Sequence, residues 1–155
     1  MPAGFTASLA NRLNSLCHID VKEASNGDIL ENGVAYIAPG GFHLKVKKLG
    51  TSYVIQTDLE EPRKGHRPSV NVMFESLSHL KNTHVIAVIM TGMGADGSEG
   101  LLAMKREGVS TFTIAESEET SVVFGMPKAA IKTNYVNEVV SLPNIAPTII
   151  KHCSR

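Results

Sequence analysis

The sequence predicts an α/β fold: a doubly wound, mostly parallel sheet with helices on both faces and a small antiparallel hairpin insertion. Strand-like runs and helical patterns alternate along most of the 155 residues, as expected for parallel strands joined by crossover helices. Six apolar residues from Val85 to Met90 follow one another without alternation, as in a parallel strand that is buried on both faces. Two short runs, 43–48 and 52–57, come after a Pro39-Gly40-Gly41 turn and predict the hairpin.

Local patterns predict the other elements of the N-terminal half. Four apolar residues share one helical face: Phe5, Leu9, Leu13 and Leu16. They predict a helix over 6–16 with Thr6 as its N-cap. Short strands are expected around 19–22 and 34–38, and the charged stretch 58–67, which contains proline and glycine, predicts a loop.

The C-terminal half has a stronger helical pattern. Four apolar residues fall at the spacing of one helix face: Val70, Met73, Phe74 and Leu77. Ser69 precedes them as the expected N-cap. The remaining expected elements are strands at 85–91, 110–115 and 136–140 and helices at 98–107, from Pro127 onward and at 145–152.

The composition is that of an ordinary globular domain. Fifteen basic and fifteen acidic residues balance, which argues against a nucleic-acid partner or an anionic membrane surface. The chain shows no signal peptide and no apolar run long enough to cross a bilayer, so we expect a cytoplasmic protein without membrane insertion. Cys17 and Cys153 lie far apart in the sequence and are expected to be free thiols.

The turn from Thr91 to Gly97 is the strongest candidate for a functional site. It follows the apolar run directly, contains three glycines and carries one charged residue, Asp96. Ligands and catalytic groups in open α/β sheets gather where strands deliver their carboxyl ends into such turns. The alternative without function is that Asp96 is only the N-cap of the helix that follows, which Gly108 closes.

A dinucleotide site is a second alternative for this turn. Gly92-Met-Gly94-Ala-Asp-Gly97 matches the G-x-G-x-x-G fingerprint between a strand and a helix. Glu116 follows at about the spacing of the acid that binds ribose. Against this interpretation, Asp96 would place a negative charge where the helix N-terminus should attract pyrophosphate.

The turn also resembles a known family. Met90-Thr-Gly-Met-Gly-Ala-Asp-Gly97 is similar to the signature of the catalytic domain of bacterial chemotaxis protein-glutamate methylesterases, the CheB-type response-regulator methylesterases. Four further blocks resemble the same family in the same order: Met1–Thr6, Tyr36–Leu44, Gly65–Phe74 and Ser121–Pro127. Together the five blocks cover nearly the whole chain.

The resemblance implies a serine hydrolase in which Asp96 is the acid of a Ser-His-Asp triad. It makes the backbone amide of Met93 part of the oxyanion hole, where a glycine-flanked turn leaves the backbone unobstructed. By this alignment the serine and the histidine lie upstream of Met1, and no Gly-x-Ser-x-Gly turn occurs within residues 1–155. We therefore expect one catalytic domain over 1–155 that lacks this segment, includes no receiver domain, and is inactive by itself.

The resemblance also implies candidate contacts and partners. His66 and Arg67 lie in a loop that borders the active-site cleft in the family, and Arg67 has the forked donors that suit carboxylates. The implied partners are methyl-accepting chemotaxis receptors and, in the full-length protein, a receiver domain and a chemotaxis kinase. No pair of histidines has the spacing of a metal site, and neither a metal nor a cofactor is expected.

Two further expectations concern the chain as a whole. The rival to an enzyme is a non-catalytic, degenerate interaction domain of the same fold. If the serine-bearing strand is missing, the sheet edge that it leaves should favour self-association.

Overall fold

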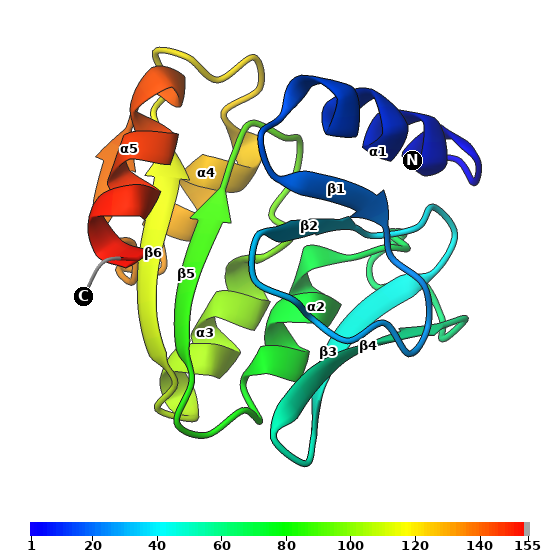
Figure 1. Cartoon of the computed structure of the whole chain (residues 1–155). Helices are drawn as coiled ribbons and strands as arrows, with labels where there is room; N and C mark the ends of the chain where they lie inside the picture. The colour runs from blue at the N-terminus through cyan, green and yellow to red at the C-terminus, as the bar shows by residue number, and fades with distance from the viewer. Residues whose placement is uncertain (154–155) are drawn as a thin grey trace. The chain divides into compact units, whose positions relative to one another are not determined.

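The structure is a computed structural model that describes residues 1–153. The chain divides into two compact units, Met1–Leu77 and Ser78–Arg155, and each is described by itself below. Both contain parallel strand pairs flanked by helices, and the first also contains an antiparallel hairpin (Figure 1). The predicted fold class is confirmed by these elements, whereas a single domain over 1–155 stays a prediction.

The first unit begins with helix α1 (Phe5–Leu16) and two short parallel strands, β1 (Asp20–Glu23) and β2 (Val34–Ile37). An antiparallel hairpin follows, formed by β3 (His43–Leu49) and β4 (Ser52–Asp58). Helix α2 (Val70–Leu77) packs against β3. A small apolar core of Ala24, Leu44 and Ile55 holds these elements, with Met73 of α2 packed against it.

Thr6 is not the N-cap that the sequence predicts. The cap position of α1 is occupied by Gly4, and Thr6 lies inside the first turn of the helix, fully buried. Its hydroxyl donates to the Glu23 carboxylate and accepts the backbone N–H of Gly40. Thr6 therefore uses its side chain to tie α1 to β1 and to the turn before β3.

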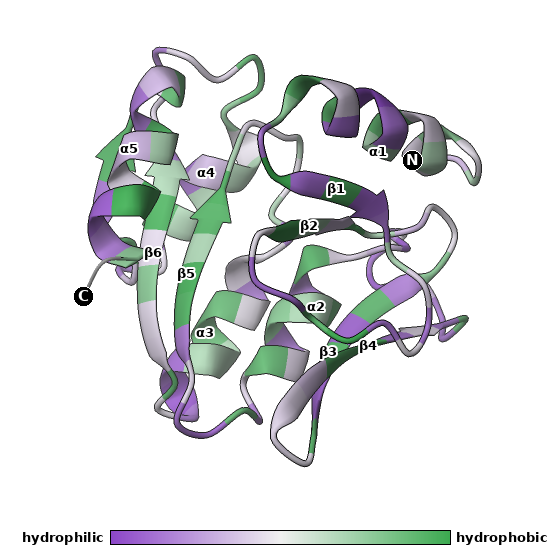
Figure 2. Ribbon diagram, in the orientation of Figure 1, coloured by the Kyte–Doolittle hydropathy of each residue, from purple (hydrophilic) through white to green (hydrophobic). Residues whose placement is uncertain are grey.

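The second unit is a three-stranded parallel sheet with the order β5-β6-β7. Its strands are β5 (His84–Ile89), β6 (Ser110–Glu116) and β7 (Glu138–Val140). Its helices are α3 (Ser98–Arg106), α4 (Gly125–Ile131) and α5 (Leu142–Cys153). Helices α3 and α4 contact each other on one face of the sheet and α5 covers the other (Figure 1). Figure 2 shows β5 as hydrophobic for most of its length, as its apolar run predicts.

The structure shifts two predicted boundaries near the C-terminus. The expected strand at 136–140 is reduced to Glu138–Val140, because Asn137 bonds to the backbone of Thr113 through both its side-chain oxygen and its own N–H. Helix α5 begins at Leu142, three residues before the predicted start. Pro143 falls in its first turn, where the missing N–H costs no helical hydrogen bond.

Candidate active site

The signature turn, defined as residues 91–97, leaves β5 at its carboxyl end. The sequence predicts that this strand runs to residue 91. In the structure β5 ends at Ile89, so Met90 and Thr91 lie beyond its end. Three main-chain bonds tie the turn to Val123, just before α4, and to the first two residues of α4. Gly92 donates to the carbonyl of Val123 at 2.9 Å, and its own carbonyl accepts the amides of Gly125 at 3.1 Å and Met126 at 2.8 Å.

Glycines in this region are needed for specific steric reasons. Gly94 and Gly97 have φ angles of +90° and +98°, a region that side-chain-bearing residues rarely adopt. A Cβ on Gly125 would stand 2.8 Å from the carbonyl oxygen of Gly92 and 2.9 Å from the nitrogen of Gly94. The turn and the start of α4 therefore approach so closely that only a residue without a side chain fits between them.

Asp96 lies in the turn, at the carboxyl end of β5, and is half-buried. The N-cap of α3 is Gly97, one residue later, so the interpretation of Asp96 as the cap residue itself is wrong. The helix is instead entered through a main-chain turn in which Ser98 donates to the carbonyl of Ala95 at 3.2 Å.

Met93 is the third residue of the signature turn. Its side chain is 81% exposed, and within residues 1–153 its backbone amide donates no hydrogen bond to a protein acceptor. An oxyanion hole needs a fixed N–H group whose acceptor arrives with the substrate. Among the residues that the structure describes, the amide of Met93 has no protein acceptor, so it is free to bind an oxygen of a substrate. The main-chain bonds of the preceding residue, Gly92, fix its position.

Thr91 and Glu116 make contacts at this turn that the local sequence does not predict. The backbone N–H of Thr91 donates to Oε2 of Glu116 at 2.8 Å, and the Thr91 hydroxyl exchanges hydrogen bonds with the backbone N–H and carbonyl of Val123 at 2.9 and 3.1 Å. The contact between Thr91 and Glu116 could have been predicted from the expected parallel pairing of β5 and β6. Their carboxyl ends must lie side by side, which brings Glu116 next to Thr91.

The position of Glu116 also argues against the dinucleotide interpretation. Its side chain is only 1% exposed and is bonded to the backbone at Thr91. A ribose-binding acid must instead present its carboxylate to the ligand. The glycine pattern at 92–97 is explained by the turn itself: Gly94 and Gly97 have positive φ angles, and a Cβ on Gly92 would meet the side chain of Met126.

His66 and Arg67 lie in the first unit, in the charged loop, defined as residues 58–67. His66 exchanges two main-chain hydrogen bonds of 3.0 Å with Arg63, closing a tight turn at Lys64 and Gly65, both with positive φ. The His66 side chain is exposed at this turn. Arg67 is half-buried and donates through Nη1 to the carbonyls of Leu59 and Glu60, each at 3.2 Å.

Ion pairs hold the base of the charged loop. Nζ of Lys45 lies 2.9 Å from Asp58 and 2.7 Å from Glu60. Burial raises the pKa of Asp58, but the hydrogen bonds from Lys45 and from the Glu60 amide outweigh it, so this pKa lies below its ordinary value. Burial likewise opposes the charged form of Lys45, yet its bonds to Glu60 and Asp58 raise its pKa.

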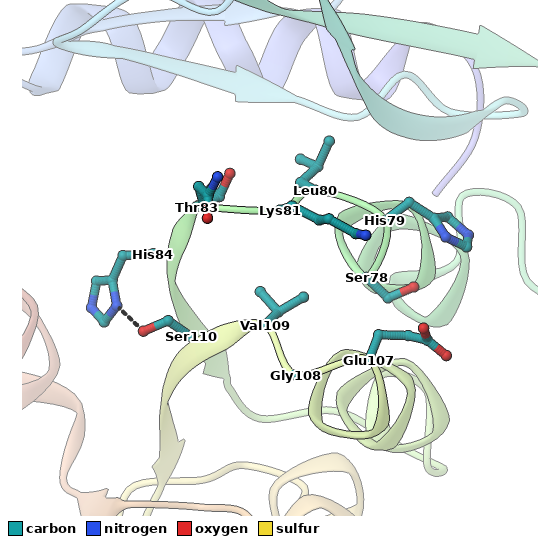
Figure 3. A pocket seen from close by; sticks show the side chains of 11 residues that line it. Ser78, His79, Leu80, Lys81, Thr83, His84, Glu107, Gly108, Val109 and Ser110 are labelled. Carbon is teal, nitrogen blue, oxygen red and sulfur yellow. Dashed lines mark hydrogen bonds between the residues drawn. The ribbon is translucent and has the colours of Figure 1, made fainter.

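A hollow of about 610 Å³ lies at the opposite end of the second unit's sheet, at the amino ends of β5 and β6 (Figure 3). Figure 3 shows that Nδ1 of His84 is hydrogen bonded to Oγ of Ser110 at its margin, at 2.9 Å. Ligands of parallel α/β sheets bind at the carboxyl ends of the strands. The hollow is therefore separate from the candidate active site.

The described residues contain no cluster of three or more histidine, cysteine or acidic side chains arranged to hold a metal ion. Among these same residues, no helix is both long and apolar enough to span a membrane. Cys17 and Cys153 are free, as expected from the sequence, and both are exposed.

The family-like sequence blocks are brought together within each unit. In the first unit, Pro2 and Thr6 of the first block contact Gly40 of the second, and Met73 of the third packs on the core that contains Leu44. In the second unit, the signature turn is bonded to Val123 and to the residues that follow it. Blocks far apart in the sequence are thus structural neighbours.

Comparison with known proteins agrees with this arrangement. The family model described as CheB methylesterase matches residues 1–149. Curated proteins named protein-glutamate methylesterase/protein-glutamine glutaminase are 61% identical over 155 residues in Halalkalibacterium halodurans and 52% identical over 151 residues in Oceanobacillus iheyensis. They are covered over 44% and 43% of their own lengths, and the present chain over 100% and 97%.

A solved structure gives the same result. The crystal structure of the Thermotoga maritima CheB methylesterase catalytic domain matches with a TM-score of 0.92 and 39% identity, covering 97% of this chain and 79% of that one. The chain spans less than half the length of the curated relatives it matches. The family match over almost all of its residues, together with these relatives, shows that the chain belongs to the CheB methylesterase family.

Proposed function

We propose that residues 1–155 form part of a single catalytic domain that hydrolyses glutamate methyl esters, and deamidates glutamines, on chemotaxis receptors. The activity is the one named for the curated relatives. The observation that carries the proposal is the signature turn, which places a half-buried carboxylate, Asp96, close in the chain to an amide without a protein acceptor, that of Met93. These are two parts of an acyl-transfer site.

The roles of the two groups follow from the chemistry of acyl transfer. In a polypeptide that also carries the family's serine and histidine, the serine attacks the ester carbonyl and the histidine accepts its proton. The Asp96 carboxylate holds the imidazole in the correct tautomer and stabilises the imidazolium that forms. The amide of Met93 donates to the oxygen that becomes negative in the tetrahedral intermediate. Methanol leaves from an ester and ammonia from a glutamine, and water then releases the glutamate.

Substrate contact is assigned to the charged loop. The exposed imidazole of His66 is the first candidate, and the second is the part of the Arg67 guanidinium not used on the carbonyls of Leu59 and Glu60. The methyl-accepting receptors are the substrates, and a receiver domain and a chemotaxis kinase are the regulatory partners in the full-length protein. This chemistry belongs in the cytoplasm, where the signalling domains of such receptors lie.

The test compares Asp96→Asn with the unaltered sequence in a polypeptide that carries the serine and histidine together with residues 1–155. Methanol release from methylated receptor should fall by about 10⁴-fold, because an amide in place of the acid disturbs the histidine tautomer in such triads. Glu107→Gln removes one negative charge at the other end of α3 and should leave the rate within about twofold, since surface changes far from the chemistry have small effects. An Asp96→Asn variant with full activity would remove Asp96 from the mechanism.

The same experiment separates the enzyme from its rival. A non-catalytic interaction domain would bind methylated receptor without releasing methanol, even with the serine and histidine present. Tight binding of NAD would instead restore the dinucleotide interpretation, which the burial of Glu116 argues against.

A further inference from the structure

Glu116 is a buried acid that the proposed mechanism does not use. It is the last residue of β6 and is 1% exposed. Within the described residues its Oε2 accepts the backbone N–H of Thr91, and its Oε1 has no hydrogen-bond partner. Burying a carboxyl group is costly unless it is hydrogen bonded, so its single bond to the base of the signature turn needs an explanation.

Thr91 is the point where the signature turn is fixed on two sides. Its hydroxyl donates to the carbonyl of Val123 and accepts the backbone N–H of the same residue. Its backbone N–H is the remaining donor, and Glu116 takes it. The segment before α4 therefore holds the turn through the Thr91 side chain, and β6 holds it through the Thr91 main chain.

The bond to Glu116 constrains the groups that the chemistry needs. Met93 is only two residues after Thr91, and its amide has no protein acceptor of its own within residues 1–153. A change in the backbone at Thr91 therefore moves this amide without breaking any bond that the amide makes. Misplacement of a catalytic group by about 1 Å can cost on the order of 10²-fold in rate.

We propose that Glu116 is a positioning residue, whose carboxyl oxygen fixes Thr91 and thereby aims the Met93 amide at the developing oxyanion. This inference rests on the proposed function. The alternative is that Glu116 is a buried acid that matters only for stability. The positioning role and the purely structural role differ in their effect on kcat. Loss of an interaction made only in the transition state lowers kcat and leaves KM unaltered, whereas loss of stability alone leaves kcat of the folded enzyme unaltered.

The experiment uses the same serine- and histidine-bearing polypeptide with three variants. Glu116→Gln keeps an acceptor oxygen in the same place, Glu116→Leu removes it, and Glu119→Gln is the control at an exposed acid in the connection to α4. For Glu116→Leu we expect kcat to fall by about 10²-fold, the loss attributed to a misaimed group, with KM changed less than about twofold. Glu116→Gln and Glu119→Gln should retain activity within about threefold, because neither removes the acceptor.

A spectroscopic readout tests the hydrogen bond without reference to activity. The Thr91 amide proton should resonate at the same position in the control, move slightly in Glu116→Gln and shift upfield in Glu116→Leu. Folded Glu116→Leu with unaltered kcat would overturn the positioning role, and so would a Glu116→Gln variant as impaired as Glu116→Leu. A fully active Asp96→Asn enzyme would defeat the proposed function instead, while the Thr91 resonance would still report whether Glu116 holds the turn.

Discussion

The signature turn and the charged loop both carry candidate site residues, but they are built in different ways. The turn is held mainly through its main chain, by Gly92 and the amide of Thr91. The loop is held mainly by its own charged side chains, with Arg67 on two carbonyls, Lys45 on Asp58 and Glu60, and Arg63 on Glu75. A turn fixed through its backbone can place a group for chemistry with little conformational freedom. In a loop that is fixed by side chains, many charged groups already bond to the protein, so fewer of them remain to bind a substrate.

This difference predicts where substitutions will affect rate and where they will affect stability. Changes in the signature turn should appear in kcat, because the proposed function has the groups presented there act on the transition state. Changes in the charged loop should appear in KM or in the free energy of unfolding. Three experiments on the serine- and histidine-bearing polypeptide test this contrast.

The largest of these three effects is expected at Met93, where the backbone rather than the side chain is assigned the function. Met93→Pro removes the N–H group and should lower kcat by about 10²–10³-fold, the usual cost of losing one oxyanion-hole donor. Met93→Ala keeps the N–H and loses only an 81% exposed side chain, so kcat should stay within about threefold. Equal losses in the two variants would mean that the thioether, not the amide, contributes to the reaction.

The fold class and the candidate acid follow from the sequence because they depend on local pattern. The apolar run 85–90 predicts a buried strand, and the glycine-rich turn after it places Asp96 at the carboxyl end. The role of Thr6 does not follow from the local sequence, because a threonine hydroxyl can either cap a helix or bond to another element. Its partners, Glu23 and Gly40, are far away in the chain. The role of Glu116 was missed for the same reason, since its bond to Thr91 depends on strand register.

An intermediate effect is expected at His66 and Arg67 in the charged loop. The first should change KM and the second the free energy of unfolding. His66→Ala removes an exposed side chain and should raise KM by about 3–10-fold with kcat unaltered, as loss of uniform substrate binding does. Arg67→Met removes the bonds to Leu59 and Glu60 and should lower the free energy of unfolding by about 1 kcal/mol or more. Steady-state kinetics and urea titrations measure the two quantities. An unaltered KM in His66→Ala would remove that residue from the substrate-binding surface.

The smallest effect is expected at the ion pairs of Lys45, and it depends on pH. The pKa of Asp58 is lowered in the folded protein: burial alone would raise it, but the bonds from Lys45 and the Glu60 amide outweigh burial. Its contribution is therefore present above the unfolded pKa of about 3.9 and is lost as the pH falls through the lower folded value. Lys45 has a raised pKa, with the opposite dependence at alkaline pH.

Asp58→Asn should therefore lower the free energy of unfolding at pH 7 by about 1 kcal/mol, the upper end for a pair that is not fully buried. The difference from the unaltered protein should begin to shrink as the pH falls below about 4, and it should disappear only below the lowered folded pKa of Asp58, where this carboxyl group is neutral. Glu60→Gln removes the more exposed partner of Lys45 and should cost about 0.3 kcal/mol. Buried His43, which acts electrostatically on Asp58 and is bonded to the carbonyl of Glu61, is left unaltered in both variants. Urea titrations between pH 3 and pH 8 measure these differences. A difference for Asp58→Asn that is as large at pH 3 as at pH 7 would show that its hydrogen-bonding geometry, rather than its charge, holds the base of the loop.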